Sequence, residues 1–159
     1  MYNIVVDSDA LIKLAKSGLL QTIASRTHLL ISERVYDEVV KKGKEKMYDD
    51  AITVEKLVYE GIIRRVKEEG TESASGEHSS LNIFRQTNAA AIVSDDQRFL
   101  SFLESEGIPF IIPSHMIIRL VQRRKISAQT AISGLKRIRA LIRNDAYQEA
   151  MNLIGGEDL

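Results

Sequence analysis

The strongest constraint on the fold is an alternation along the chain between short apolar runs and longer stretches with helical spacing. The runs are rich in β-branched residues and continuous, which is typical of parallel strands buried on both faces. They lie at residues 4–6, 29–31, 62–66, 91–93 and 110–112. Strands that alternate with helices connect through right-handed crossovers. The sequence therefore predicts an α/β fold, a three-layer α/β/α sandwich around a central, mostly parallel sheet of about five strands.

Between these runs, apolar residues recur at the spacing of helices that bury one face. The stripes are Leu11, Leu14 and Ala15; Val35 and Val39; Ile52, Leu57 and Val58; Leu81, Phe84 and Asn88; and Phe99, Leu100 and Leu103. After the last strand we expect helices at residues 117–124, 128–142 and 146–154. No repeat or linker interrupts the 159 residues, so we expect a single domain over residues 1–159.

Composition excludes several classes of protein. The absence of cysteine rules out a disulfide framework, zinc ribbons and thiol catalysis. The apolar runs are too short to cross a membrane, and the N-terminus lacks the features of a signal peptide, so we expect a cytoplasmic protein. The 22 basic side chains offset 22 acidic ones, which argues against binding nucleic acid through overall charge.

Carboxylates follow two of the expected strands. Asp7 comes directly after the run at residues 4–6, and Asp95 and Asp96 follow the run at residues 91–93 after one serine. In a parallel sheet the carboxyl ends of the strands meet at one edge, where ligands usually bind. Aspartate after a strand is also a common helix N-cap, and we favour that role for Asp9. For Asp7 and the Asp95–Asp96 pair, the recurrence favours a functional site.

Two glutamates extend this set. Glu38 lies at the edge of the apolar stripe formed by Val35 and Val39, where a solvated helix face and a site are equally good interpretations. Glu77 lies four residues before Leu81, which places it on the inward side of its helix. A buried carboxylate needs a partner, and the N-terminus of a helix favours its negative charge.

Four carboxylates in one cleft repel one another unless a cation neutralises them. Hard oxygen ligands without cysteine or a spaced histidine partner favour Mg²⁺ or Mn²⁺ over zinc. Such a site activates water and neutralises charge on a phosphoryl group, so the chemistry indicated is hydrolysis of a phosphodiester.

Four motifs, in this order and spacing, resemble those of the PIN-domain family of metal-dependent ribonucleases. They are residues 4–12, which include Asp7; residues 35–39, which include Glu38; Gly76 and Glu77 followed by Leu81 and Ile83; and residues 93–98, which include Asp95 and Asp96. The resemblance covers a core from about residue 3 to 125, followed by a C-terminal helical extension at 126–154 that is similar to the helices of small prokaryotic members.

The resemblance implies a central parallel sheet and an acidic pocket for one or two Mg²⁺ or Mn²⁺ ions. By motif position, Asp7, Glu77 and one of Asp95 and Asp96 hold metal, and Glu38 completes the pocket directly or through water. Small members of the family are often toxins of the VapC type, paired with an antitoxin protein and commonly homodimeric. The segment at residues 47–61 and the C-terminal extension make this chain less like a minimal toxin.

Basic residues form two clusters near the C-terminus: Arg119, Arg123, Arg124 and Lys125, and Lys136, Arg137, Arg139 and Arg143. A solvated helix face and a surface that follows RNA phosphates are about equally good explanations.

The balanced overall charge conceals an uneven distribution of charge along the chain. Residues 1–106 carry a net charge of −4, residues 107–144 carry +8 with no acid, and residues 145–159 carry −4.

The leading hypothesis is therefore a Mg²⁺- or Mn²⁺-dependent endoribonuclease whose substrate is RNA. One alternative is a PIN-like module that binds RNA or protein without cutting. Another is a phosphatase of the haloacid-dehalogenase type, since Asp7 and Asp9 after a strand imitate its nucleophile motif. Ala10 and Leu11 depart from that motif, and 159 residues leave no room for a cap domain.

Overall fold

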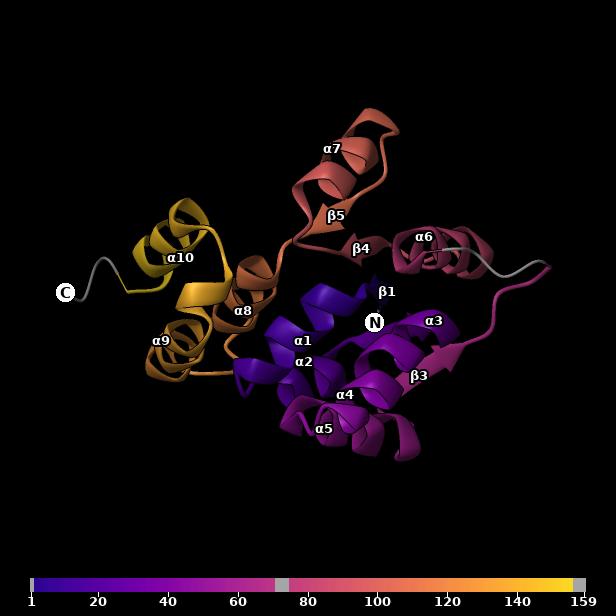
Figure 1. Cartoon of the computed structure of the whole chain (residues 1–159). Helices are drawn as coiled ribbons and strands as arrows, with labels where there is room; N and C mark the ends of the chain where they lie inside the picture. Colours follow the sequence, from indigo (N-terminus) through magenta and orange to yellow (C-terminus); the bar gives the residue numbers. More distant parts are fainter. Residues whose placement is uncertain (1, 71–74, 156–159) are drawn as a thin grey trace.

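The structure is a computed structural model, which describes residues 2–70 and 75–155 (Figure 1). Its centre is a five-stranded sheet in the order β3-β2-β1-β4-β5, with every neighbouring pair parallel. The strands are β1 (Asn3–Val6), β2 (His28–Ser32), β3 (Ile63–Val66), β4 (Ala91–Val93) and β5 (Phe110–Ile111). The predicted α/β class and all five predicted strands are confirmed.

The central strand shows why the apolar runs are continuous. β1 pairs with β2 on one side and with β4 on the other, with Ile4 opposite Leu29 and Ala91. Its side chains alternate between two hydrophobic clusters, because Ile4 and Val6 belong to one cluster and Val5 to the other. Both faces of the strand are therefore buried, and an alternating polar pattern is excluded.

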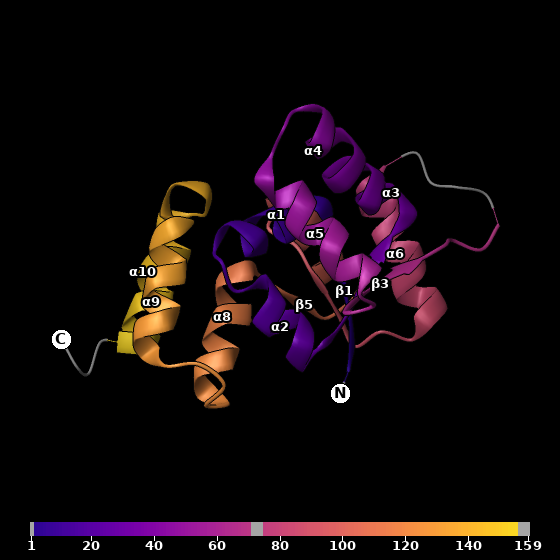
Figure 2. The ribbon, with the colours of Figure 1, turned by 90° about the horizontal axis from the view of Figure 1, so that it is seen from below.

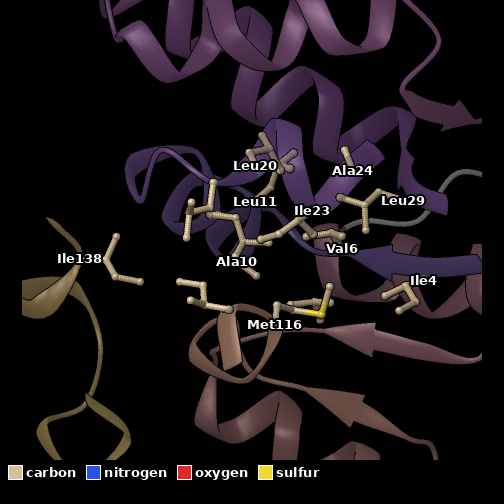
Figure 3. Close-up of a cluster of buried hydrophobic side chains, with 14 of the residues drawn as sticks. Ile4, Val6, Ala10, Leu11, Leu20, Ile23, Ala24, Leu29, Met116 and Ile138 are labelled. Atoms are coloured by element: carbon tan, nitrogen blue, oxygen red, sulfur yellow. The ribbon is translucent and has the colours of Figure 1, made fainter. Parts of the chain in front are cut away.

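Helices cover both faces of the sheet. On one face lie residues of α1 (Ser8–Lys16), α2 (Leu20–Arg26), α5 (Asp49–Tyr59) and α8 (Pro113–Gln122). On the other face lie α6 (Gly76–Thr87) and α7 (Gln97–Ser105), which bury Leu81, Ile83, Phe99 and Leu103. Figure 3 shows the first cluster, where Met116 of α8 lies beside side chains of β1 and α1. These layers make the three-layer sandwich expected from the sequence.

Three consecutive helical segments connect β2 to α5: α3 (Glu33–Tyr36), the π-helical segment η1 (Asp37–Lys41) and α4 (Lys42–Glu45). At the C-terminus, α9 (Ala128–Arg137) and α10 (Asn144–Gly155) pack against α8 and against each other. In Figures 1 and 2 these C-terminal helices lie at one side of the molecule, on the far side from α6.

Several details differ from the sequence-based expectation. Helix α8 begins at Pro113 instead of residue 117, and Ile52, expected in a buried stripe, is 61% exposed. The seven-residue helix α2 was not predicted, although Leu20 and Ile23 are buried in the core. The helix expected at residues 128–142 ends at Arg137, and the 3₁₀ turn η2 (Arg139–Leu141) follows. Ile138 leaves the helical conformation at this point and is fully buried, so core packing explains the break. In the part of the chain that the structure describes, no helix is long and apolar enough to cross a membrane.

Candidate active site

A cavity of about 530 Å³ opens at the carboxyl edge of the sheet, where β1 and β4 end. This is the point at which the strand order reverses direction, and such a switch point is the usual ligand site of an open parallel sheet. The cavity is lined by Asp7, Ser8, Asp9, Glu38, Ser75, Gly76, Glu77, Asp95, Asp96 and Gln97. All five residues predicted as site residues therefore lie around one cavity, and they come from four separate segments of the chain.

Asp7 is the most deeply buried of these carboxylates, with 5% of its surface exposed. Its backbone N–H donates to the carbonyl of Val93 in β4, and its carboxylate accepts from the N–H of Ala10 at 2.9 Å. Burial raises the pKa of Asp7 to about 6, and the charges of Asp9 and Glu77 add to the rise, whereas hydrogen bonds from Ser94 and Ala10 oppose it. The negative charge at this position is therefore costly in the absence of a cation.

The helix cap predicted for Asp9 is wrong, because Asp7 caps α1 instead. Helix α1 begins at Ser8, two residues earlier than the cap role of Asp9 requires, so Asp9 lies within its first turn. There the Asp9 side chain is 57% exposed and pairs with Lys13 at 2.8 Å.

The adjacent aspartates after β4 have different environments. The Asp95 side chain is 7% exposed and its Oδ2 lies 2.6 Å from Nζ of Lys13, whose own side chain is 12% exposed. Asp96 is exposed, and its Oδ1 accepts from the N–H of Phe99 to cap α7. Asp95 is thus occupied by an internal cation, whereas Asp96 lies open to the cavity.

Glu38 lies in the π-helical segment, where the Lys42 N–H bonds to the Asp37 carbonyl five residues earlier. This wider turn buries both Val39 and Val40 and leaves Glu38 half-buried, facing the cavity. The Ser8 hydroxyl donates to its Oε2 at 2.5 Å, and Nε of Arg34 lies 3.5 Å from its Oε1.

Glu77 is in the first turn of α6, which Ser75 caps through the N–H of His78. The prediction that Glu77 points inward with Leu81 is wrong in one respect, because its side chain is exposed at the cavity wall. The first turn of α6 extends beyond the packed sheet, so its inward side faces the cavity instead of the core. Partial burial raises the pKa of Glu77, and the charges of Asp96 and Glu38 contribute.

Gly76 brings α6 close to Glu38. A Cβ atom at Gly76 would lie 3.1 Å from Oε2 of Glu38, closer than nearly all such contacts. Glycine at this position therefore allows the N-terminus of α6 to lie against the Glu38 carboxylate.

A family model described as PIN domain matches residues 3–156. The chain belongs to the PIN-domain family. A search of curated proteins found no match. PIN domains have a nuclease-type fold and usually use divalent metals, so the family agrees with the position and the acidity of the cavity.

The carboxylates of this PIN domain have the donor atoms and the charge that a divalent cation requires. Their oxygens are hard ligands of the kind Mg²⁺ and Mn²⁺ prefer. Burial is the largest cause of the raised pKa values of Asp7 and Glu77, and neighbouring acids add to the rise, so a cation would stabilise the charged forms. Within residues 2–70 and 75–155, however, no three acidic or histidine side chains are close enough together to hold an ion as they stand. The cavity therefore provides the donor types and their charge, and a bound ion requires the side chains to adjust.

Two contacts around the PIN cavity were not predicted from the sequence. Lys13 bridges Asp9 and Asp95, and its four-residue spacing from Asp9 on one helix was a visible signal for the first of these contacts. Ser8 donates a hydrogen bond to Glu38 across 30 residues of chain, and no local sequence pattern indicates that contact.

Proposed function

We propose that this PIN domain is a Mg²⁺- or Mn²⁺-dependent endoribonuclease that hydrolyses phosphodiester bonds of RNA. The observation that carries the proposal is the gathering of Asp7, Glu38, Glu77 and Asp96 around one cavity from four segments of the chain. A divalent ion bound there supplies an activated water and neutralises charge on the phosphate.

Asp7, Glu77 and Asp96 are the metal-holding residues in this proposal. The charge of Asp96 contributes to the raised pKa of Glu77, and the charge of Glu77 contributes to the raised pKa of Asp7, which supports the proximity of the three groups. Asp95 is the poorer ligand, because its ion pair with Lys13 already compensates its charge. Asp95 instead fixes the position of the loop that carries Asp96.

The remaining groups bind and orient the substrate. Helices α1, α6 and α7 all begin at the cavity, and their N-terminal dipoles favour the phosphate that approaches it. Glu38, held by Ser8 and Arg34, orients the attacking water and accepts its proton.

The test is cleavage of a labelled single-stranded RNA with Mn²⁺, together with calorimetric titration of Mn²⁺. Asp7→Asn, Glu77→Gln and Asp96→Asn should abolish cleavage and weaken Mn²⁺ binding, while thermal unfolding shows that the variants remain folded. Glu104→Gln, an exposed acid on α7 outside the cavity, is the matched control and should cleave normally. Cleavage that persists in the first three variants contradicts the proposal.

A second candidate is a PIN-like module that binds RNA or protein without cutting. The absence of a ready three-ligand cluster in the described residues favours this candidate. It predicts no Mn²⁺ binding by calorimetry and no cleavage with any divalent ion, and the titration above distinguishes the two.

A narrower form of the proposal is that the nuclease acts in the cytoplasm as a homodimeric toxin held inactive by an antitoxin protein. The resemblance of the C-terminal helices to those of small prokaryotic PIN domains supports it. Expression of the wild-type chain should arrest growth, whereas expression of Asp7→Asn should not. A small protein encoded beside it should restore growth; growth without arrest refutes the toxin role.

A further inference from the structure

A second groove lies at the opposite edge of the sheet from the acidic cavity. It measures about 310 Å³ and is lined by Ile23, Ser25, Arg26, Thr27, Met116, Arg119, Leu120, Arg123 and Lys125. Arg26 ends α2, two residues before β2 begins, which places the groove at the amino edge of the strands. A neighbouring depression of about 280 Å³ shares Arg119 and includes Tyr2, Ala91 and Phe110, which precede or begin β1, β4 and β5.

All the charged side chains that line this groove are basic. Arg26, Arg119, Arg123 and Lys125 come from two separate segments, and no acidic residue lines the groove. Throughout residues 2–70 and 75–155, these four side chains form no ion pair and no side-chain hydrogen bond, whereas Lys13, Lys16 and Arg65 do.

Two of the four cations, Arg119 and Arg123, are close enough to repel each other. They lie one helical turn apart on α8, and partial burial together with the charge of Arg123 lowers the pKa of Arg119. Like charges at this spacing are unfavourable in a helix, and no acidic side chain lines the groove to offset the repulsion. Arg119 in the last turn of α8 and Arg123 at its C-cap lie where the helix dipole favours a cation.

Aromatic side chains lie beside the cations. Tyr2 is 68% exposed and Phe110 is 37% exposed, and both line the depression that shares Arg119. Exposed aromatic rings next to unpaired arginines form the type of surface on which single-stranded nucleic acid binds, with bases stacked and phosphates neutralised.

We propose that the groove between α2 and α8, with Tyr2 and Phe110 beside it, binds the phosphate backbone of RNA at a site separate from the cleavage cavity. The inference rests on the proposed ribonuclease function for the identity of the ligand. A strand of four residues spans about 13 Å, so the two sites are separated by at least that length of sheet. RNA that contacts both sites must pass around the molecule, and a very short oligonucleotide contacts only one.

The test measures binding of fluorescein-labelled single-stranded RNA by anisotropy at several salt concentrations, with EDTA present to prevent cleavage. Each phosphate contact contributes about 0.7 to the slope of log affinity against log salt for a single strand. Arg119→Gln with Arg123→Gln should therefore reduce the steepness by about 1.4 and weaken binding. A second double variant, Arg123→Gln with Lys125→Gln, changes only exposed residues and should give the same reduction.

The matched control is Arg64→Gln with Arg85→Gln, which removes two exposed arginines from β3 and α6, away from the groove. The control should keep the wild-type slope. An unchanged slope in both groove variants overturns the proposal. A further result also overturns the proposal: a glutamate-rich peptide with the same net charge as the RNA displaces the RNA, while the groove variants keep the wild-type salt dependence of RNA binding. That result indicates an acidic protein partner.

The experiments distinguish failure of the groove proposal from failure of the proposed function. If the groove variants lose the salt dependence but the wild-type chain never cleaves RNA, the ribonuclease proposal fails and the groove remains. If Asp7→Asn abolishes cleavage while the groove variants bind as the wild type does, the groove fails and the ribonuclease remains. Cleavage of a dinucleotide, which has a single phosphodiester bond, should be unaffected in the groove variants, because such a substrate is too short to reach the groove from the cavity.

Discussion

Replacing Asp7 by asparagine should stabilise the folded protein in the absence of metal. Asp7 is almost completely buried, and burial is the largest cause of the rise in its pKa from 3.8 to about 6. This rise corresponds to about 3 kcal/mol, at about 1.4 kcal/mol per unit of pKa. The folded state therefore binds the proton more tightly than the unfolded state, and the charged form opposes folding.

The pH dependence follows from this difference. Above pH 6 the carboxyl is ionised in both states, so the full cost of about 3 kcal/mol applies. As the pH falls from about 6 to 3.8, the folded protein takes up the proton and the cost disappears. Asparagine retains an oxygen that can accept from the N–H of Ala10, so the cap of α1 is kept. The Asp7→Asn variant should thus be more stable than wild type at neutral pH and equally stable below about pH 4.

The assay is thermal unfolding in EDTA at several pH values. For a chain of this size, about 3 kcal/mol corresponds to an increase in Tm of about 6–12 °C at neutral pH. Glu104→Gln changes the net charge equally at an exposed position and should leave Tm nearly unchanged. Added Mn²⁺ should raise the Tm of wild type but not of the variant. A variant that melts at or below the wild-type temperature at pH 7.5 in EDTA refutes the reasoning.

Two further predictions concern the cavity wall. Lys13→Met should lower the free energy of unfolding in urea by about 3 kcal/mol, because it leaves Asp95 buried without its cation. A second substitution, Asp95→Asn, should recover most of this loss, whereas Asp9→Asn at the exposed position should not. Gly76→Ala should reduce Mn²⁺-dependent cleavage severalfold without lowering Tm, because the new methyl group displaces the Glu38 carboxylate while alanine favours the helix; wild-type cleavage by this variant would contradict the close approach.

The sheet was predictable because its signal is local. Each of the five runs is apolar on successive residues, and burial on both faces is what such a run requires. Helix α2 was missed because seven residues allow only two turns, too few for its spacing to stand out. The end of α9 was misplaced because Ile138 fits the helical stripe equally well. Its departure from the helix depends on a core assembled from distant segments.

Convergence of the carboxylates was likewise predictable, because parallel strands must end at the same edge. The different environments of Asp95 and Asp96 were not, since they depend on Lys13, 82 residues earlier in the chain. Glu38 faces the cavity because it lies in a π-helical turn, and a pattern based on regular α-helical spacing does not predict such a turn. Sequence thus indicated which residues meet, and tertiary contacts determine how each one is charged and paired.

The direction of the strands and helices gives the two edges of the sheet opposite electrostatic characters. At the carboxyl edge α1, α6 and α7 begin, and the dipoles at their N-termini partly stabilise the cluster of acids. At the amino edge α2 and α8 end, and their C-termini favour the unpaired arginines there. Without a divalent ion the acidic edge repels RNA, so binding in EDTA must depend on the basic edge. Cleavage should therefore require metal, whereas RNA binding through the basic groove should persist without it.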